Sequence, residues 1–201
     1  MDTAIVDATV LTFADGSPGI IEDGAVGIDG DELAYVGPAA DFDSVDAETV
    51  VDGSGLVAMP GLVDAHVHSK HTLLRGGAQD VPEIEWMNRG LGPFATESDA
   101  EDRVAGARLG VLEATLAGAT TVGEYADHVD DLVESVYRPF GTRVVAIETI
   151  NEVREDRSDL GPRELYEFDR DRGEQAFERA NALFDDFGDD PLVTPMYGPQ
   201  A

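Results

Sequence analysis

Two histidines separated by one residue are the strongest chemical signal in the chain. His66 and His68 end the run Met59-Pro-Gly-Leu-Val-Asp-Ala-His-Val-His68, whose apolar and small residues are typical of a buried strand. In an extended strand, residues i and i+2 project from the same face, so both imidazoles are expected to point the same way. Such a pair can hold a divalent metal, zinc before iron or manganese, although most isolated His-x-His pairs hold none.

A metal held by this pair would bring defined chemistry. A catalytic zinc lowers the pKa of a bound water toward neutrality and so provides a nucleophile for attack on a carbonyl or amidine-like carbon. Such a zinc normally has three protein ligands, so His66 and His68 account for only part of the site. His71 is an alternative third ligand, although its spacing places it beyond the end of the strand.

The strongly acidic composition limits the partners of the chain. Its 201 residues include 42 acidic and 13 basic side chains, which give a formal net charge of −29, and Lys70 is the only lysine. Such a surface repels nucleic acids and anionic membranes, so we expect neither as a partner. Apolar residues make up 42% of the chain, which favours a folded protein over a disordered one. The acidic, lysine-poor composition is similar to that of proteins from salt-loving organisms, and we interpret the charge as a halophilic adaptation.

The sequence contains neither cysteine nor a targeting signal. Without cysteine, disulfides and thiolate metal sites are excluded. The first residues do not show the basic and then apolar pattern of a signal peptide, and no apolar run reaches about 18 residues. The sequence therefore predicts a soluble, cytoplasmic protein.

Short strands and glycine turns dominate the first sixty residues. Ala4 to Thr12 is a predicted strand followed by the turn pair Asp15-Gly16, and a hairpin is predicted around Asp29-Gly30. Val50-Val51 and Leu56 to Ala58 flank a glycine turn in the same manner. This spacing predicts a small β-sandwich.

The remaining residues alternate helices with strands. Residues 69–97 contain several Gly and Pro residues and are predicted to form a long functional loop with a helical turn. Ser98-Asp-Ala-Glu101 is typical of a capping box, and the apolar stripe after it predicts a helix of about twenty residues. The later predicted strands are Thr120–Tyr125, Arg143–Ile150 and Leu192–Tyr197. This alternation predicts βαβ units, a parallel sheet and the α/β class.

The run P-G-L-V-D-A-H-V-H and the T-L-L-R-G that follows it resemble the first barrel strand of the amidohydrolase superfamily. The likeness is to the branch that holds cytosine-deaminase-like enzymes, triazine chlorohydrolases and S-adenosylhomocysteine deaminases. It implies the N-terminal part of a metal-dependent hydrolase (β/α)8 TIM barrel, preceded by a small β-sandwich domain, with both incomplete. Residues 1–60 would form the partial, composite sandwich, and residues 61–201 about four βα units of the barrel.

The same resemblance assigns other parts of the site. The family takes its remaining metal ligands, and usually a general acid or base, from later strands, so catalytic residues are expected beyond Ala201. Trp86 matches the tryptophan of the family's Glu-Trp-Leu segment and would wall a substrate pocket, although an aromatic in an apolar patch is more often core. Gln200 is the second candidate for substrate binding, because it replaces a substrate-contacting histidine in a Gly-Pro-His stretch.

Three departures from the family weaken an adenosine-type substrate. Gln200 can hydrogen-bond a substrate but cannot act as a proton shuttle. Ala95 stands where nucleoside-processing members have a ribose-binding glutamate. Glu148 replaces a substrate-binding arginine in the third strand.

Four other polar residues have competing interpretations. Lys70 and His71 could border the pocket, but we favour solvated positions on a charged loop. His128 is expected to begin a helix rather than to reach the barrel mouth. Glu124, near the end of the second strand, faces either the interior or the helices, and the sequence does not decide between them.

Two hypotheses for the function remain. In the first, the chain is part of a metal-dependent amidohydrolase or aminohydrolase that cleaves non-peptide C–N bonds of a small heterocyclic substrate, as deaminase-like and chlorohydrolase-like enzymes do. In the second, it is a truncated or split fragment without activity of its own that serves as an assembly partner, because an open barrel leaves an unpaired strand edge. Both allow a complementary C-terminal polypeptide, and the open edge also allows a homo-oligomer.

Overall fold

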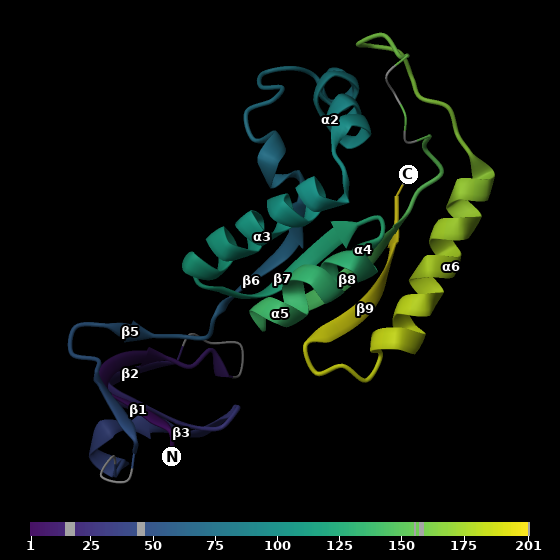
Figure 1. The fold of residues 1–201 in the computed structure, drawn as a ribbon. Helices are drawn as coiled ribbons and strands as arrows, with labels where there is room; N and C mark the ends of the chain where they lie inside the picture. The colour runs from purple at the N-terminus through teal and green to yellow at the C-terminus, as the bar shows by residue number, and fades with distance from the viewer. Residues whose placement is uncertain (15–18, 44–46, 155, 157–158, 201) are drawn as a thin grey trace. The chain divides into compact units, whose positions relative to one another are not determined.

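The computed structural model describes residues 1–14, 19–43, 47–154, 156 and 159–200. The chain falls into two compact units, Met1–Gly61 and Leu62–Ala201 (Figure 1). The turn pair expected at Asp15-Gly16 lies outside the described residues. Among the described helices, none combines the length and the apolar character that crossing a lipid bilayer requires.

The first unit is built on one mixed β-sheet. Its elements are β1 Thr3–Leu11, β2 Ile20–Asp29, β3 Glu32–Pro38, the 3-10 helix η2 Ala39–Asp41, β4 Thr49–Asp52 and β5 Val57–Ala58. The strand order is β3-β2-β1-β4, and β5 also pairs with β1. β2 and β3 form the antiparallel hairpin that was expected around Asp29-Gly30, and Gly30 adopts a φ of +61° that glycine tolerates without steric cost.

The hairpin expected from Val50-Val51 and Leu56 to Ala58 is wrong. Both segments instead pair in parallel with β1. The Gly53 N–H donates to the Val6 carbonyl at 2.7 Å, so the intervening turn keeps the chain running alongside β1 instead of folding it back on β4. The described strands of this unit form a single sheet, and the second, facing sheet of a sandwich stays a prediction.

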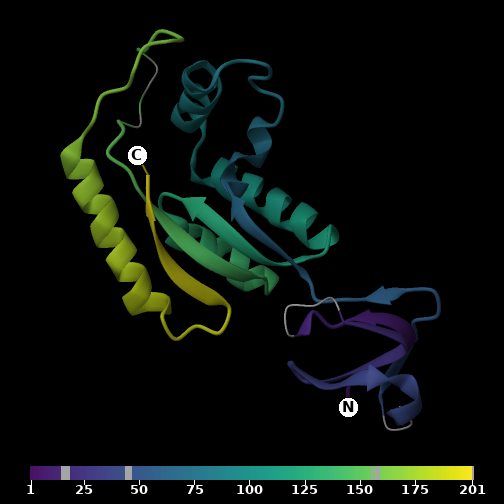
Figure 2. The same ribbon diagram turned by 180° about the vertical axis from the view of Figure 1, so that it is seen from behind.

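The second unit is a parallel sheet with helices packed on it. Its strands are β6 Leu62–Val67, β7 Ala119–Ala126, β8 Arg143–Ile150 and β9 Val193–Pro199, and they lie in that order across the sheet. Its main helices are α3 Ala100–Leu116, α4 Val129–Leu132, the π-helix η5 Val133–Tyr137, α5 Arg138–Phe140 and α6 Arg170–Phe187 (Figures 1 and 2). The predicted alternation and parallel pairing are confirmed, whereas closure into a (β/α)8 barrel stays a prediction.

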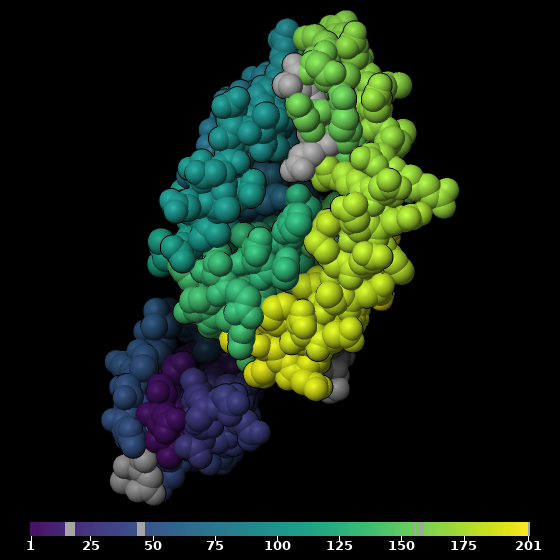
Figure 3. Space-filling view, turned by 45° about the vertical axis from the view of Figure 1, so that its right-hand side comes forward, coloured from purple at the N-terminus to yellow at the C-terminus, as the bar shows by residue number. Residues whose placement is uncertain are grey.

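The core of the second unit lies between the sheet and these helices. Val122, Val144 and Val193, one from each of three neighbouring strands, belong to the same buried cluster as Val111 of α3 and Leu183 of α6. Figure 3 shows the atoms of β9 and α6, in yellow and yellow-green, beside the green atoms of the β7 to β8 region. This packing fixes one face of the sheet, and the side chains of the other face are left to line a site.

Four short helical pieces connect β6 to α3, where the sequence predicted a loop with a helical turn. They are η3 Ser69–Leu74, α1 Glu83–Trp86, the π-helix η4 Met87–Leu91 and α2 Gly92–Glu97. Asn88 in η4 donates to the carbonyls of Gly161 and Glu164 at 3.0 and 3.1 Å. The connection is therefore tied to the segment that precedes α6.

Helix α3 is capped one residue later than the sequence predicted. Asp99, not Ser98, is the N-cap, and its side chain accepts from the Asp102 N–H while the Asp102 side chain accepts from the Asp99 N–H. Aspartate caps a helix as well as serine does, so the reciprocal pair forms equally well at this register.

The apolar stripe predicted for α3 is only partly buried. Gly106, Ala107 and Val111 are buried, whereas Leu112 and Leu116 are 44% and 79% exposed. The reason is that the helix uses glycine to approach η3 closely: a Cβ at Gly106 would lie 2.7 Å from the Lys70 carbonyl oxygen. Close packing on η3 decides which face of the helix is buried, and the leucine spacing does not reveal it.

Replacing Gly106 by alanine is expected to lower the free energy of unfolding by about 1 to 3 kcal/mol, although the same change in an open helix adds about 1 kcal/mol. The clash is with a backbone atom, which cannot rotate away. Urea unfolding at constant salt measures the change. Ala105→Gly, at an exposed position of the same helix, is the control and should lose about 1 kcal/mol through helix propensity alone. A more stable Gly106→Ala protein would contradict this packing.

Candidate functional site

The structure brings the two histidines of the motif together at the carboxyl end of β6. The rings of His66 and His68 lie 4.9 Å apart, centre to centre, and are nearly perpendicular. Tyr125, near the end of the neighbouring strand β7, contacts both rings, with centroid distances of 5.2 and 5.6 Å. Carboxyl ends of parallel strands are where barrel enzymes place their reacting groups, so the pair sits where a site is expected.

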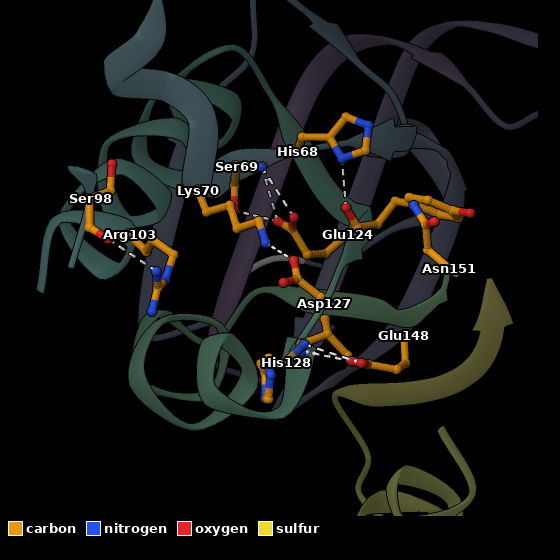
Figure 4. A network of polar contacts seen from close by, with 12 residues as sticks. His68, Ser69, Lys70, Ser98, Arg103, Glu124, Asp127, His128, Glu148 and Asn151 are labelled. Carbon is orange, nitrogen blue, oxygen red and sulfur yellow. Dashed lines mark hydrogen bonds and ion pairs between the residues drawn. The ribbon is translucent and has the colours of Figure 1, made fainter. Parts of the chain in front are cut away.

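The hydrogen bonding of His68 fixes which of its nitrogens is available. Its Nδ1 lies 2.6 Å from the Tyr125 carbonyl oxygen, and because that oxygen can only accept, Nδ1 carries the proton (Figure 4). In the neutral ring, Nε2 then keeps its lone pair. Burial lowers the pKa of His68, with the Tyr125 carbonyl opposing the shift, so the neutral imidazole is favoured. A neutral imidazole held by a carbonyl through its other nitrogen is the usual form of a metal ligand.

No third ligand accompanies this pair among the residues that the structure describes. Across the described ranges, no group of three or more His, Cys, Asp or Glu side chains is placed to hold a metal ion. The ring of His71 lies 5.8 Å from that of His68 and packs on Phe94. Burial lowers the pKa of His71 to about 4. The alternative of His71 as third ligand is therefore not supported, and the donor set present fits part of a metal site.

A cavity of about 320 Å³ lies beside His68 in the second unit. Trp86 and Gln200, the two residues expected to contact substrate, both line it, as does His71. The Gln200 side-chain oxygen accepts from the Asn151 amide nitrogen at 2.6 Å, which orients the glutamine. Trp86 is 36% exposed, so it belongs to the wall of the cavity more than to the core.

The solvated position expected for Lys70 is wrong. Lys70 is 7% exposed, lines the cavity and forms an ion pair with Asp127, which directly follows β7 (Figure 4). Burial on its own would raise the pKa of Asp127, but the charge and hydrogen bond of Lys70 outweigh it and hold that pKa at about 2. The lysine can be buried because its charge is matched.

Glu124 faces the helices, which settles the question that the sequence left open. It is fully buried and accepts hydrogen bonds from the Ser69 N–H, the Ser69 hydroxyl and the Tyr137 hydroxyl. Ser69 directly follows His68, so this cluster fixes the backbone just beyond the histidine pair. Sequence reasoning did not identify Ser69 or Tyr137, because nothing in their local pattern marks them.

His128 begins helix α4, as expected, with a left-handed φ of 53°. Its N–H and that of Val129 donate to Glu148 at 3.2 and 3.0 Å, and Arg179 Nε donates to the same carboxylate at 2.8 Å. Glu148 therefore binds the first N–H groups of a helix and is absent from the cavity wall. That Glu148 replaces a substrate-binding arginine of the family stays a prediction, and its partner Arg179 lines the cavity.

Comparisons with known proteins agree with this geometry. Residues 57–185 match the sequence model described as the amidohydrolase family. The 5-methylthioadenosine/S-adenosylhomocysteine deaminase of Moorella thermoacetica is 35% identical over 133 residues, which are 66% of this chain and 30% of that protein. The deaminase of the same name from Halothermothrix orenii is 32% identical over 80% of this chain and 37% of its own length. The matched segments thus span about a third of these relatives.

Solved structures show the same fold over nearly the whole chain. An adenosine deaminase from Xanthomonas campestris with bound zinc has a TM-score of 0.81 and 28% identity over 98% of this chain and 42% of its own. The atrazine chlorohydrolase of Arthrobacter aurescens, complexed with zinc, has a TM-score of 0.74 and 23% identity over 98% of this chain and 46% of its own. At 23% identity, the similarity to the atrazine chlorohydrolase shows a shared fold and nothing further.

Proposed function

The chain belongs to the amidohydrolase family, and from that premise we propose that it forms the N-terminal part of a metal-dependent hydrolase acting on C–N bonds other than peptide bonds. The substrate is a small heterocycle, in a deaminase-like or chlorohydrolase-like reaction. One observation carries the proposal: His66 and His68 lie together at a strand end, and His68 presents an unprotonated Nε2 beside a cavity of substrate size.

His66 and His68 would hold the metal, and zinc is the first candidate because the adenosine deaminase of the same fold contains it. When bound, the metal supplies an activated water for attack on the carbon of the C–N bond. The Tyr125 carbonyl holds His68 in one tautomer and one orientation. Trp86 forms an apolar wall for the heterocycle, and Gln200, oriented by Asn151, hydrogen-bonds a polar substrate atom without moving a proton.

The remaining ligands and the general acid or base are proposed to come from a complementary segment or polypeptide. Both edges of the parallel sheet carry exposed apolar side chains that further strands would cover: Val63 on β6 is 68% exposed and Met196 on β9 is 50% exposed. The same edges favour the second candidate, a fragment without turnover of its own that serves as an assembly partner or forms a homo-oligomer.

Zinc binding tests the proposal directly. We expect the chain to bind zinc in competition with a chromophoric chelator, and we expect His66→Ala and His68→Ala each to weaken binding more than about tenfold, because even groups that only orient a ligand contribute 10- to 100-fold. The control is His128→Asn, which removes an exposed histidine outside the cavity and keeps a residue that tolerates the left-handed φ of 53°.

Equal affinity in all four proteins, or none in the wild type, would defeat the metal site. The two candidate functions differ in a second measurement on the same samples. Zinc binding with C–N hydrolysis favours the enzyme, whereas zinc binding without turnover, in the chain alone and with a complementary polypeptide, favours the assembly partner.

A further inference from the structure

The cavity beside His68 is lined by more basic than acidic side chains, unlike the chain as a whole. Among the described lining residues four are basic and two are acidic, whereas the whole chain has 13 basic and 42 acidic residues. The acidic pair is Glu83 and Asp127. The basic set is Lys70, Arg103, Arg172 and Arg179. Among the described residues, the lining of this cavity is thus rich in basic side chains, in a chain where acidic residues outnumber basic ones.

The contacts of these basic groups distinguish Arg103 from Lys70 and Arg179. The charge of Lys70 is matched by Asp127, and Arg179 donates through Nε to Glu148. Arg103, on the first turn of α3, donates from Nη1 to the Ser98 carbonyl at 3.2 Å (Figure 4). Within the described residues no carboxylate lies within 4 Å of its guanidinium. In a chain this acidic, a half-buried arginine without a carboxylate partner is unexpected unless the partner is a ligand.

We propose that this cavity binds a substrate with an anionic group, a carboxylate or a phosphate, and that Arg103 makes the ionic contact. The inference rests on the proposed function in that both concern the same cavity, and it narrows the substrate class. A guanidinium offers a planar fork of N–H donors that matches both anions. Arg179 adds a second guanidinium to the wall, with its Nε committed to Glu148. The anionic group would anchor the substrate at Arg103, and the C–N bond to be cleaved would face the metal site of His66 and His68.

The acidic exterior opposes the binding of an anion, so an anionic substrate needs a basic contact inside the cavity. A chain with a formal charge of −29 repels anions at long range. At 1 M salt the screening length is about 3 Å, so this long-range repulsion is largely removed. A half-buried pair is screened much less than an exposed one. Preference for an anionic ligand should therefore persist in high salt.

Trp86 provides the readout, because it is the only tryptophan and lines the same cavity. Its fluorescence is followed during titration with adenosine, adenosine 5′-carboxylate and adenosine 5′-monophosphate, in EDTA and constant high salt. These probes share the heterocycle and differ at one substituent. We expect at least one anion to bind about tenfold or more tightly than adenosine. Loss of a hydrogen bond to a charged group usually lowers affinity by about this factor. The tighter of the two identifies the carboxylate or the phosphate.

Arg103→Gln should reduce anion affinity to that of adenosine, and Arg103→Lys should restore part of the preference. Arg108→Gln is the matched control, since Arg108 lies on the same helix, donates to one carbonyl, that of Ser135, and is outside the cavity. Equal binding of adenosine and both anions, no response to either anion, or equal effects of Arg103→Gln and Arg108→Gln would overturn the inference. Because no metal is present, an anion preference without zinc binding refutes the proposed function alone, and the reverse result refutes the inference alone.

Discussion

Asp127→Asn is expected to lower the free energy of unfolding of the second unit by about 3 to 5 kcal/mol, because it leaves a buried lysine without its counter-charge. The Lys70 side chain is 9% exposed and that of Asp127 is 26% exposed. The Lys70 backbone is also held by α3, since its carbonyl oxygen lies against Gly106. Lys70 therefore cannot move to solvent without moving the segment that follows His68.

The pair should also give a defined acid dependence. The folded-state pKa of Asp127 is about 2, below the ordinary 3.8, so the pair contributes stability that is present above pH 3.8 and is lost as the pH falls through about 2. Asp127→Asn should remove this part of the acid response. Urea unfolding of both proteins at constant salt, repeated over that pH range, measures the difference.

An exposed ion pair provides the matched control. Glu113 binds Arg75, and their side chains are 45% and 65% exposed. Glu113→Gln should change the free energy of unfolding far less than Asp127→Asn does, because solvent screens an exposed ion pair. If Asp127→Asn costs no more than Glu113→Gln, Lys70 is solvated after all and the buried pair is refuted.

Lys70 shows why local sequence fails for charged residues. Its neighbours suggest a solvated loop, but its partner Asp127 lies 57 residues further along the chain. The two meet because β6 and β7 pair in parallel, so that their carboxyl ends lie side by side. The contacts of Glu148 are likewise invisible to local sequence, since its partners come from the start of α4 and from α6.

The features that could be predicted depend on neighbours in the sequence. Strand β8 has the predicted bounds, Arg143–Ile150, because a β-branched run lies between a glycine turn and a polar loop. The meeting of His66 and His68 follows from the two-residue period of a strand. This local rule is enough to locate the histidine pair in the sequence. The residues that form the cavity wall are identified only from the tertiary structure.

Features that depend on packing could not be predicted in the same way. A strand in a parallel sheet is covered on both faces, so the pattern of β7 does not tell which face carries Glu124. Helix α3 is a second case, because its buried face is marked by glycine and alanine at Gly106 and Ala107. Its larger residues Leu112 and Leu116 are exposed. Hydrophobic spacing therefore predicts the helix correctly but predicts the wrong buried face.

Glu124→Ala is the second change expected to be severely destabilising, by about 3 to 5 kcal/mol. It would leave a void in the core and remove the acceptor of the Ser69 N–H, the Ser69 hydroxyl and the Tyr137 hydroxyl. Because Ser69 follows His68, zinc affinity should fall as well. Tyr137→Phe is the control: it removes one donor, keeps the carboxylate on Ser69, and should cost about 1 kcal/mol.

The isosteric variant Glu124→Gln tests the electrostatics of the same cluster. Burial raises the pKa of Glu124 above its ordinary 4.5, against the opposing effect of its donors. A raised folded-state pKa contributes stability that is present below pH 4.5 and is lost as the pH rises through the raised value. The stability of the wild type minus that of Glu124→Gln should therefore fall with rising pH, and the contributions of the other carboxylates cancel in this difference. A difference that grows with pH would mean that Ser69 and Tyr137 stabilise the ionised carboxylate more than burial penalises it.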